Sequence, residues 1–215
     1  MGTPDLSGLA QARSDLMSYN RKTHSRDAQE GFSLLEMLTV LAIMMILAAM
    51  AIISINGALP AQEATAGVNA AAGVFRQGRD SAVAERRSFQ LVTTVPNQIG
   101  LERIEIGGTL IALPIVTLPA PAQFMMYQGI PDTPDGYGTC TNGLCFGGTP
   151  TQTWLSDGTF VDAAGNPLNA TIFIAVPGKS LTDPTYMSTQ RAFTILGTTG
   201  RIRAYRWTGG SWVLQ

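Results

Sequence analysis

Four groups of side chains in this sequence could do chemistry, and each predicts a different kind. Glu36 is a single carboxylate at the edge of a long uncharged run, where an acid calls for a cationic partner. Cys140 and Cys145 are close enough in sequence to form a small disulfide loop or to bind a metal. Asp157 and Asp162 carry carboxylate oxygens of the kind that ligate calcium. Arginines alternate with aromatic residues near the C-terminus, a pattern that suits nucleic acid.

The two cysteines flank the sequence Thr-Asn-Gly-Leu, and Asn-Gly is a favoured pair for a two-residue β-hairpin turn. In such a hairpin Cys140 and Cys145 face each other as a non-hydrogen-bonded pair. Their Cα atoms are then about 4.5 Å apart, within the disulfide range. We therefore predict a Cys140–Cys145 disulfide, formed in an oxidising compartment. The alternatives are two free thiols or half of a metal site, although a zinc site needs more ligands and the chain has no second cysteine pair.

The stretch over residues 184–215 contains four arginines and no acid. The side chains that form the candidate DNA-binding set are Arg201, Arg203, Tyr205, Arg206 and Trp207. Four of them alternate along the chain and would share one face of a strand. One alternative is an ordinary amphipathic strand with core aromatics and solvated arginines, and another is a protein contact. The formal net charge of −1 for the whole chain is unlike that of a dedicated DNA binder.

The first element that must position these groups is an uncharged apolar stretch from Met37 to Gln62. It is long enough for a membrane-spanning helix, which needs about 20 apolar residues. Four basic residues precede this stretch, and the first one after it is Arg76. By the positive-inside rule the N-terminus stays in the cytoplasm and the bulk of the chain crosses the membrane.

The pattern after the apolar stretch is helical up to about residue 87. One face of this segment is apolar and consists of Ala64, Val68, Ala71, Phe75 and Ala82. We therefore predict an amphipathic helix over about residues 61–87, with its apolar face packed on a sheet. Gly57 and Pro60 interrupt the helical sequence, so we expect a kink or a melted turn at residues 56–60.

The remainder of the chain, residues 89–215, is predicted to be rich in β-strands. Short apolar or alternating runs are separated by clusters of Gly, Pro, Asn and Asp. The predicted strands cover residues 89–95, 104–106, 110–113, 124–127, 153–155, 171–176, 192–196, 202–207 and 212–214. The expected fold class is α+β, in which a long N-terminal transmembrane and amphipathic helix packs on an antiparallel, β-rich C-terminal domain.

The motif Gly-Phe-Ser-Leu-Leu-Glu at residues 31–36, followed by the apolar run, resembles the processing and assembly signature of type IV pilins and type II secretion pseudopilins. This resemblance implies that a peptidase cuts between Gly31 and Phe32 and that Phe32 is then N-methylated. It also implies that Glu36 guides packing into a filament. The order of residues 74–76, 79–82, 154–159, 171–176, 193–195 and 200–203 is similar to that in minor pilins and pseudopilins of the GspH/FimT family.

The resemblance also implies how the chain is divided. Residues 1–31 are a cytoplasmic leader that is removed, residues 32–59 are the transmembrane and assembly helix, and residues 60–215 are an extracytoplasmic pilin-like domain. The true start is Met1 or Met17. A conventional signal cleavage at residues 48–51 would leave residues 31–36 unexplained. We expect a single-pass inner-membrane protein, with a periplasmic or extracellular C-terminal domain, that then joins a pilus or pseudopilus.

The expected partners are other pilin or pseudopilin subunits, the prepilin peptidase and inner-membrane lipid. We predict no enzymatic activity, no cofactor and no metal. His24, the only histidine, lies in the expected leader, and Lys179, the only lysine after the cut, lies in a loop-like Pro-Gly-Lys-Ser. The spacing of Asp157, Asp162 and Asn166 does not match a calcium-binding EF-hand loop.

The main functional hypothesis is a structural subunit, a minor pilin or pseudopilin. The first alternative is a DNA-binding minor pilin for DNA uptake, because some FimT-like minor pilins bind DNA. The second is an unprocessed single-pass membrane protein with an extracytoplasmic binding domain. The N-terminal motif serves both secretion and pilus systems, so it does not distinguish them.

Overall fold

The structure of the protein, a computed structural model, describes residues 32–215, including all of their side chains except those of residues 51–57. The chain divides into two compact units, Met1–Met50 and Ala51–Gln215. A single long helix, α2 (Leu34–Glu85), begins in the first unit and ends in the second. The other elements within residues 32–215 all belong to the second unit.

Of the kink or melted turn expected at residues 56–60, the melted turn is not found, because α2 is helical through Pro60. Proline removes one main-chain hydrogen bond, but helix formation is cooperative and the turns on either side persist. The helical turn after Pro60 is also stabilised by hydrogen bonds from side chains. The Thr65 hydroxyl donates to the Ala61 carbonyl oxygen at 2.9 Å, and Arg191 Nη2 donates to the same oxygen at 3.2 Å. These contacts stabilise the helix just beyond the proline.

Residues 32–59 were predicted to form a membrane-spanning helix. In the part of the chain that the structure describes, no helix reaches both the length and the apolarity needed to cross a membrane. The predicted span is therefore not confirmed.

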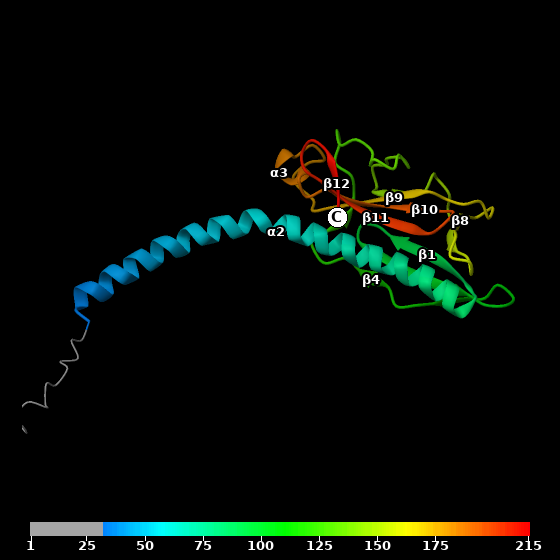
Figure 1. Cartoon of the computed structure of the whole chain (residues 1–215), viewed down its shortest axis with the longest axis horizontal. Helices are drawn as coiled ribbons and strands as arrows, with labels where there is room; N and C mark the ends of the chain where they lie inside the picture. Colours follow the sequence, from blue (N-terminus) through cyan, green and yellow to red (C-terminus); the bar gives the residue numbers. More distant parts are fainter. Residues whose placement is uncertain (1–31) are drawn as a thin grey trace, which may run out of the picture. The chain divides into compact units, whose positions relative to one another are not determined.

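The second unit contains two antiparallel sheets of six strands each. Sheet I has the order β3-β2-β1-β7-β8, with β4 also paired to β2, and sheet II has the order β12-β11-β10-β9-β5, with β6 also paired to β9. The strands of sheet I are β1 (Ser88–Thr94), β2 (Gln98–Ile104), β3 (Leu110–Ala112), β4 (Val116–Thr117), β7 (Gln152–Trp154) and β8 (Phe160–Asp162). Those of sheet II are β5 (Gln123–Phe124), β6 (Leu144–Cys145), β9 (Ala170–Ala175), β10 (Arg191–Leu196), β11 (Arg201–Trp207) and β12 (Trp212–Leu214). A one-turn helix, α3 (Pro184–Met187), precedes β10 (Figure 1).

The apolar face of α2 packs against both sheets, which confirms the α+β fold class. The predicted positions of this face are all fully buried: Ala64, Val68, Ala71, Phe75 and Ala82. Phe75 lies at the centre, with its ring centroid 5.9 Å from that of Phe160 in sheet I and 5.1 Å from that of Phe193 in sheet II. Figure 1 shows this part of α2 running along the strands. One helix face therefore completes the core of both sheets.

Most of the predicted strands are present, with shifted ends. The largest correction concerns β2, which was predicted only at residues 104–106 but covers Gln98–Ile104. Its sequence carries Gly100, Glu102 and Arg103, which hide the alternation. Pairing with β1 along the whole strand, from Ser88 opposite Ile104 to Thr94 opposite Gln98, supplies the hydrogen bonds that favour it. The short strands β4, β6 and β8 were not predicted.

Candidate functional site

Glu36 lies in the first turn of α2, and Ser33 caps this end of the helix. The Ser33 hydroxyl oxygen accepts a hydrogen bond from the Glu36 backbone N–H at 3.2 Å, and the Ser33 carbonyl oxygen accepts one from Met37 N–H at 3.1 Å. The Ser-x-x-Glu spacing of a capping box could have predicted this role from the sequence, but the cap was missed. The carboxylate of Glu36 thus belongs to the positive end of the helix dipole, which favours an acid.

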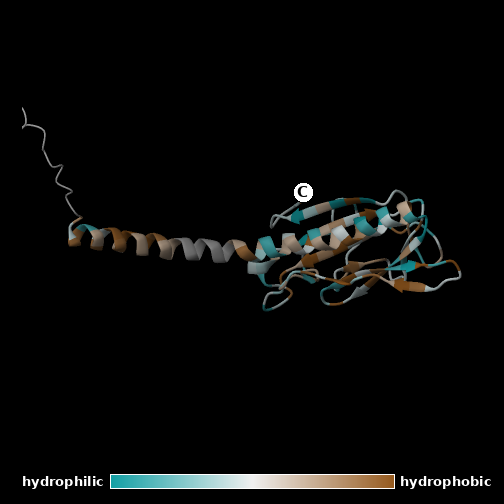
Figure 2. Ribbon diagram, turned by 90° about the horizontal axis from the view of Figure 1, so that it is seen from below, coloured by the Kyte–Doolittle hydropathy of each residue, from teal (hydrophilic) through white to brown (hydrophobic). Residues whose placement is uncertain are grey.

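The large apolar side chains on both sides of Glu36 are exposed along the helix. Phe32 is 76% exposed and Leu34 is 83% exposed. The others with exposed side chains are Leu35, Met37, Leu38, Val40, Leu41, Ile43, Met44, Met45, Ile46, Leu47 and Met50. The brown ribbon of the first turns of α2 in Figure 2 shows this apolar character. A helix that is apolar all round requires an apolar environment to cover it. Gly31 and the expected leader lie outside the described residues.

Cys140 and Cys145 form a disulfide in the structure, with their Cα atoms 5.4 Å apart. The two-residue hairpin predicted around them is not formed. Leu144 and Cys145 instead make up β6, which pairs with β9 in sheet II. The Gly143 N–H donates to the Cys140 carbonyl oxygen, so Gly143 is the fourth residue of a turn rather than one of its two central residues.

The predicted hairpin does not form because Gly143 lies close to its neighbours in the core. The Phe173 N–H donates to the Gly143 carbonyl oxygen at 2.7 Å. A Cβ atom on Gly143 would lie 2.4 Å from the Met125 nitrogen, and the φ of Gly143 is 76°. The segment therefore lies directly against β9, which offers more hydrogen bonds than an isolated hairpin would.

We expect non-reducing peptide mapping of exported protein to recover Cys140 and Cys145 linked within one peptide. Only a few residues separate the cysteines, so the disulfide lowers the conformational entropy of the unfolded chain only a little. Its reduction should therefore change the free energy of unfolding only slightly. Its effect should instead be local, in faster proteolysis of the loop around residues 125–143. Complete alkylation of both thiols without a reductant would contradict the bond.

Part of the candidate DNA-binding set on β11 is bound to Asp135, which comes from the long loop before β6. Arg203 Nη1 lies 2.9 Å from Asp135 Oδ1. The Tyr205 hydroxyl donates to Asp135 Oδ2 at 2.9 Å, and the Thr194 hydroxyl donates to the same oxygen. Burial alone would raise the pKa of Asp135, but these hydrogen bonds and the charge of Arg203 outweigh it, so the pKa lies below its usual value. Sequence reasoning missed this network because Asp135 carries no local signal.

The aromatic members of the set are buried rather than available for base stacking. Tyr205 is 4% exposed and Trp207 is 7% exposed. Trp207 packs edge-on against Trp212, with the ring centroids 5.4 Å apart. Arg201 and Arg206 are exposed. The structure therefore does not bring the five side chains together on one open surface.

Arg191, another arginine of the acid-free stretch, has a structural position that the sequence did not predict. Its side chain is buried and donates to the Thr65 hydroxyl at 3.1 Å, the Ala61 carbonyl oxygen at 3.2 Å and the Ser188 carbonyl oxygen at 3.0 Å. Burial, together with the nearby charge of Arg206, lowers the pKa of Arg191 to about 10. The guanidinium is thus still charged at neutral pH and joins β10 to α2 through neutral acceptors.

The carboxylates considered for calcium act as turn acceptors. Asp157 accepts from the N–H and the hydroxyl of Thr159, and Asp162 accepts from the backbone of Ala164 and Asn166. The hydrogen bonds from Thr159 lower the pKa of Asp157, and those from Asn166 lower that of Asp162. Over residues 32–215, no group of three or more His, Cys, Asp or Glu side chains is placed to hold a metal ion.

Comparison with known proteins identifies the N-terminal segment. Residues 26–52 match the family model of the prokaryotic N-terminal methylation motif. This match includes residues 31–36 and confirms the resemblance to the signature of type IV pilins. No curated protein matches the chain.

Two solved structures are similar to the chain, and both are of the minor pseudopilin EpsH from the type 2 secretion system of Vibrio cholerae. The first has 14% sequence identity and a TM-score of 0.41, and covers 68% of this chain and 98% of its own. The second, a crystal structure, has 14% identity and a TM-score of 0.38, and covers 65% of this chain and 92% of its own.

Proposed function

We propose that this chain, because it carries the N-terminal methylation motif of type IV pilins, is a structural subunit of a type IV pilus or of a type II secretion pseudopilus. The observation that carries the proposal is the match of residues 26–52 to that motif. The fold supports it, since one long helix leaves its first half apolar and exposed while its second half completes a folded domain. Such a subunit has a structural role and no enzymatic activity.

The assembly mechanism follows from Glu36 and the new N-terminus. Cleavage between Gly31 and Phe32 would create a free amine about one helical turn from Glu36. The exposed apolar side chains of residues 34–50 would then be covered by the same segments of neighbouring subunits. In that apolar environment a carboxylate is costly unless it is paired. The Phe32 amine of a neighbouring subunit is the partner that satisfies both charges.

We also propose where the subunit resides before assembly and to which group of pilins it belongs. Before assembly, residues 32–59 would reside in the inner membrane, with residues 60–215 on the outer side. The lipid contacts of residues 32–59 would be replaced by subunit contacts in the filament. We assign the subunit to the minor pilins and pseudopilins of the GspH/FimT type, on the order of the sequence segments over residues 74–203. Gene neighbours would distinguish a secretion system from a pilus.

The cleavage site gives a direct test of this function. The intact mass and N-terminal sequence of membrane-extracted protein are expected to show a chain that begins at N-methylated Phe32. Gly31→Ala should slow or block this processing, because the peptidase needs a small residue before the cut, whereas Gln29→Ala should be processed normally. A mature chain that retains Arg26, or that begins after Ala49 or Ala51, would contradict the proposal. The retained form would favour the unprocessed membrane protein instead.

The DNA-binding alternative receives no support from the geometry of β11. Arg203 is paired with Asp135, and Tyr205 and Trp207 are buried. Binding to DNA would have to use Arg201 and Arg206 without stacking by these aromatic residues. We therefore do not propose it as a second function.

A further inference from the structure

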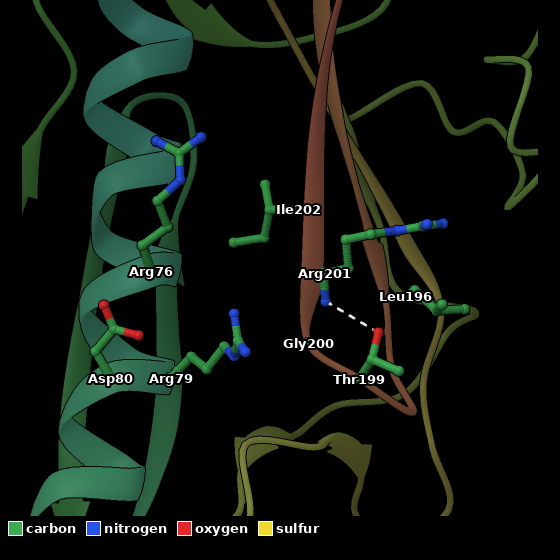
Figure 3. Close-up of a pocket in the computed structure, with 8 residues that line it drawn as sticks. All are labelled: Arg76, Arg79, Asp80, Leu196, Thr199, Gly200, Arg201 and Ile202. Atoms are coloured by element: carbon green, nitrogen blue, oxygen red, sulfur yellow. Dashed lines mark hydrogen bonds between the residues drawn. The ribbon is translucent and has the colours of Figure 1, made fainter.

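A positively charged cavity of about 610 Å³ lies between the second half of α2 and the hairpin that joins β10 to β11. Arg76, Arg79 and Asp80 line it from the helix, and Leu196, Arg201 and Ile202 line it from the hairpin (Figure 3). Its volume is within the range of small-ligand sites. Three arginines against one aspartate make it attractive to anions.

Three arginines of the second unit are held by protein acceptors, unlike those that line this cavity. Arg103, Arg191 and Arg203 all donate hydrogen bonds to protein acceptors. Within residues 32–215, the guanidinium groups of Arg76 and Arg79 have neither an ion pair nor a hydrogen bond to protein. They are three residues apart, so they neighbour each other on one helix face and their charges repel. An anion between them would remove this repulsion.

Two glycine turns lie next to the stem of Arg79. Gly158 and Gly200 both have positive φ, of 85° and 63°. A Cβ atom on Gly200 would lie 2.9 Å from Arg79 Cδ, and one on Gly158 would lie 3.5 Å from Arg79 Nε. The absence of side chains in these turns therefore leaves room for the exposed side chain of Arg79. Its guanidinium can bind a carboxylate or a phosphate through two parallel hydrogen bonds.

We propose that Arg76 and Arg79 bind an oxyanion, a phosphate or carboxylate group, of a ligand whose apolar part lies against Ile202. Figure 3 shows Arg79 reaching from the helix toward the hairpin, while the side chain of Arg201 extends away from the helix on the far side. Arg201 therefore adds positive potential at the rim instead of a direct contact. This inference does not depend on the proposed assembly function.

The test is a calorimetric titration of the detergent-solubilised full chain at low ionic strength, with inorganic phosphate in one series and citrate in the other. We expect at least one of them to bind. The double variant Arg76→Gln/Arg79→Gln should weaken that binding about tenfold or more, since each charge-assisted hydrogen bond is a strong one. Tighter binding of phosphate would indicate a phosphorylated ligand, and tighter binding of citrate a carboxylate ligand.

The matched control is Arg86→Gln/Arg206→Gln, which removes the same charge from exposed side chains that do not line the cavity. Both double variants should unfold at the temperature of the unmodified protein. Binding of neither anion would overturn the proposal. Equal weakening in the two double variants would also overturn it, because the attraction would then come from net charge alone.

Discussion

Replacing Glu36 with valine is expected to exclude the protein from filaments while leaving its processing and membrane association unchanged. In a filament the Phe32 amine of a neighbouring subunit would be surrounded by the apolar side chains of residues 34–50, and without Glu36 its charge would have no partner. Loss of a buried pair costs about 3–5 kcal/mol, so the variant should be depleted about tenfold or more from sheared filaments. Comparative immunoblotting of the sheared and membrane fractions measures this ratio.

Glu63→Ala is the matched control, because Glu63 is the next acid along α2 and lies after the uncharged stretch. It should enter filaments at the normal ratio. If Glu36→Val were incorporated as well as the unmodified protein, pairing between Glu36 and the Phe32 amine would have no role in assembly. A variant that fails to reach the membrane at all would contradict the separation of insertion from packing.

Asp135→Asn is expected to lower the free energy of unfolding by about 1–3 kcal/mol, the cost of disturbing a largely buried hydrogen-bonded group. The carboxylate is only 10% exposed and accepts from Arg203, Tyr205 and Thr194. An amide in its place would turn an NH₂ group toward at least one of these donors. Denaturant titration of the full chain, followed by tryptophan fluorescence, measures the change. Glu105→Gln, which loses a half-exposed ion pair to Arg103, should change stability less than Asp135→Asn does.

The same carboxylate makes part of the stability dependent on pH. The pKa of Asp135 is depressed in the folded protein from its ordinary 3.8, chiefly because hydrogen bonds outweigh the effect of burial. Its contribution is therefore complete above pH 3.8 and is lost as the pH falls through the lower folded value. The stability difference between the unmodified protein and Asp135→Asn should shrink over that acidic window. A difference that stayed constant with pH would mean that the charge of Asp135 is not involved.

Structural features that depend on residues close together in the sequence were predictable from the sequence. The motif at residues 31–36, the helical spacing from Ala64 to Ala82 and the strand near the C-terminus each depend on local patterns. Contacts between distant residues were not predictable. Nothing near Asp135 indicates that it meets Arg203, and nothing near Arg191 indicates that it donates to Ala61. The cysteine turn shows both cases, because the two cysteines are joined as expected while β9 changes the turn between them.

The order of strands along the chain also determines when the domain can fold. The chain builds most of sheet I with β1–β4, supplies β5 and β6 to sheet II, returns to sheet I for β7 and β8, and then completes sheet II with β9–β12. Phe75 meets its partners Phe160 and Phe193 only after these late segments have been synthesised. Such long-range contacts form slowly. The helix face around Phe75 therefore stays partly uncovered until β10 has been made, and a chain that stops before β9 would present it to proteases and chaperones.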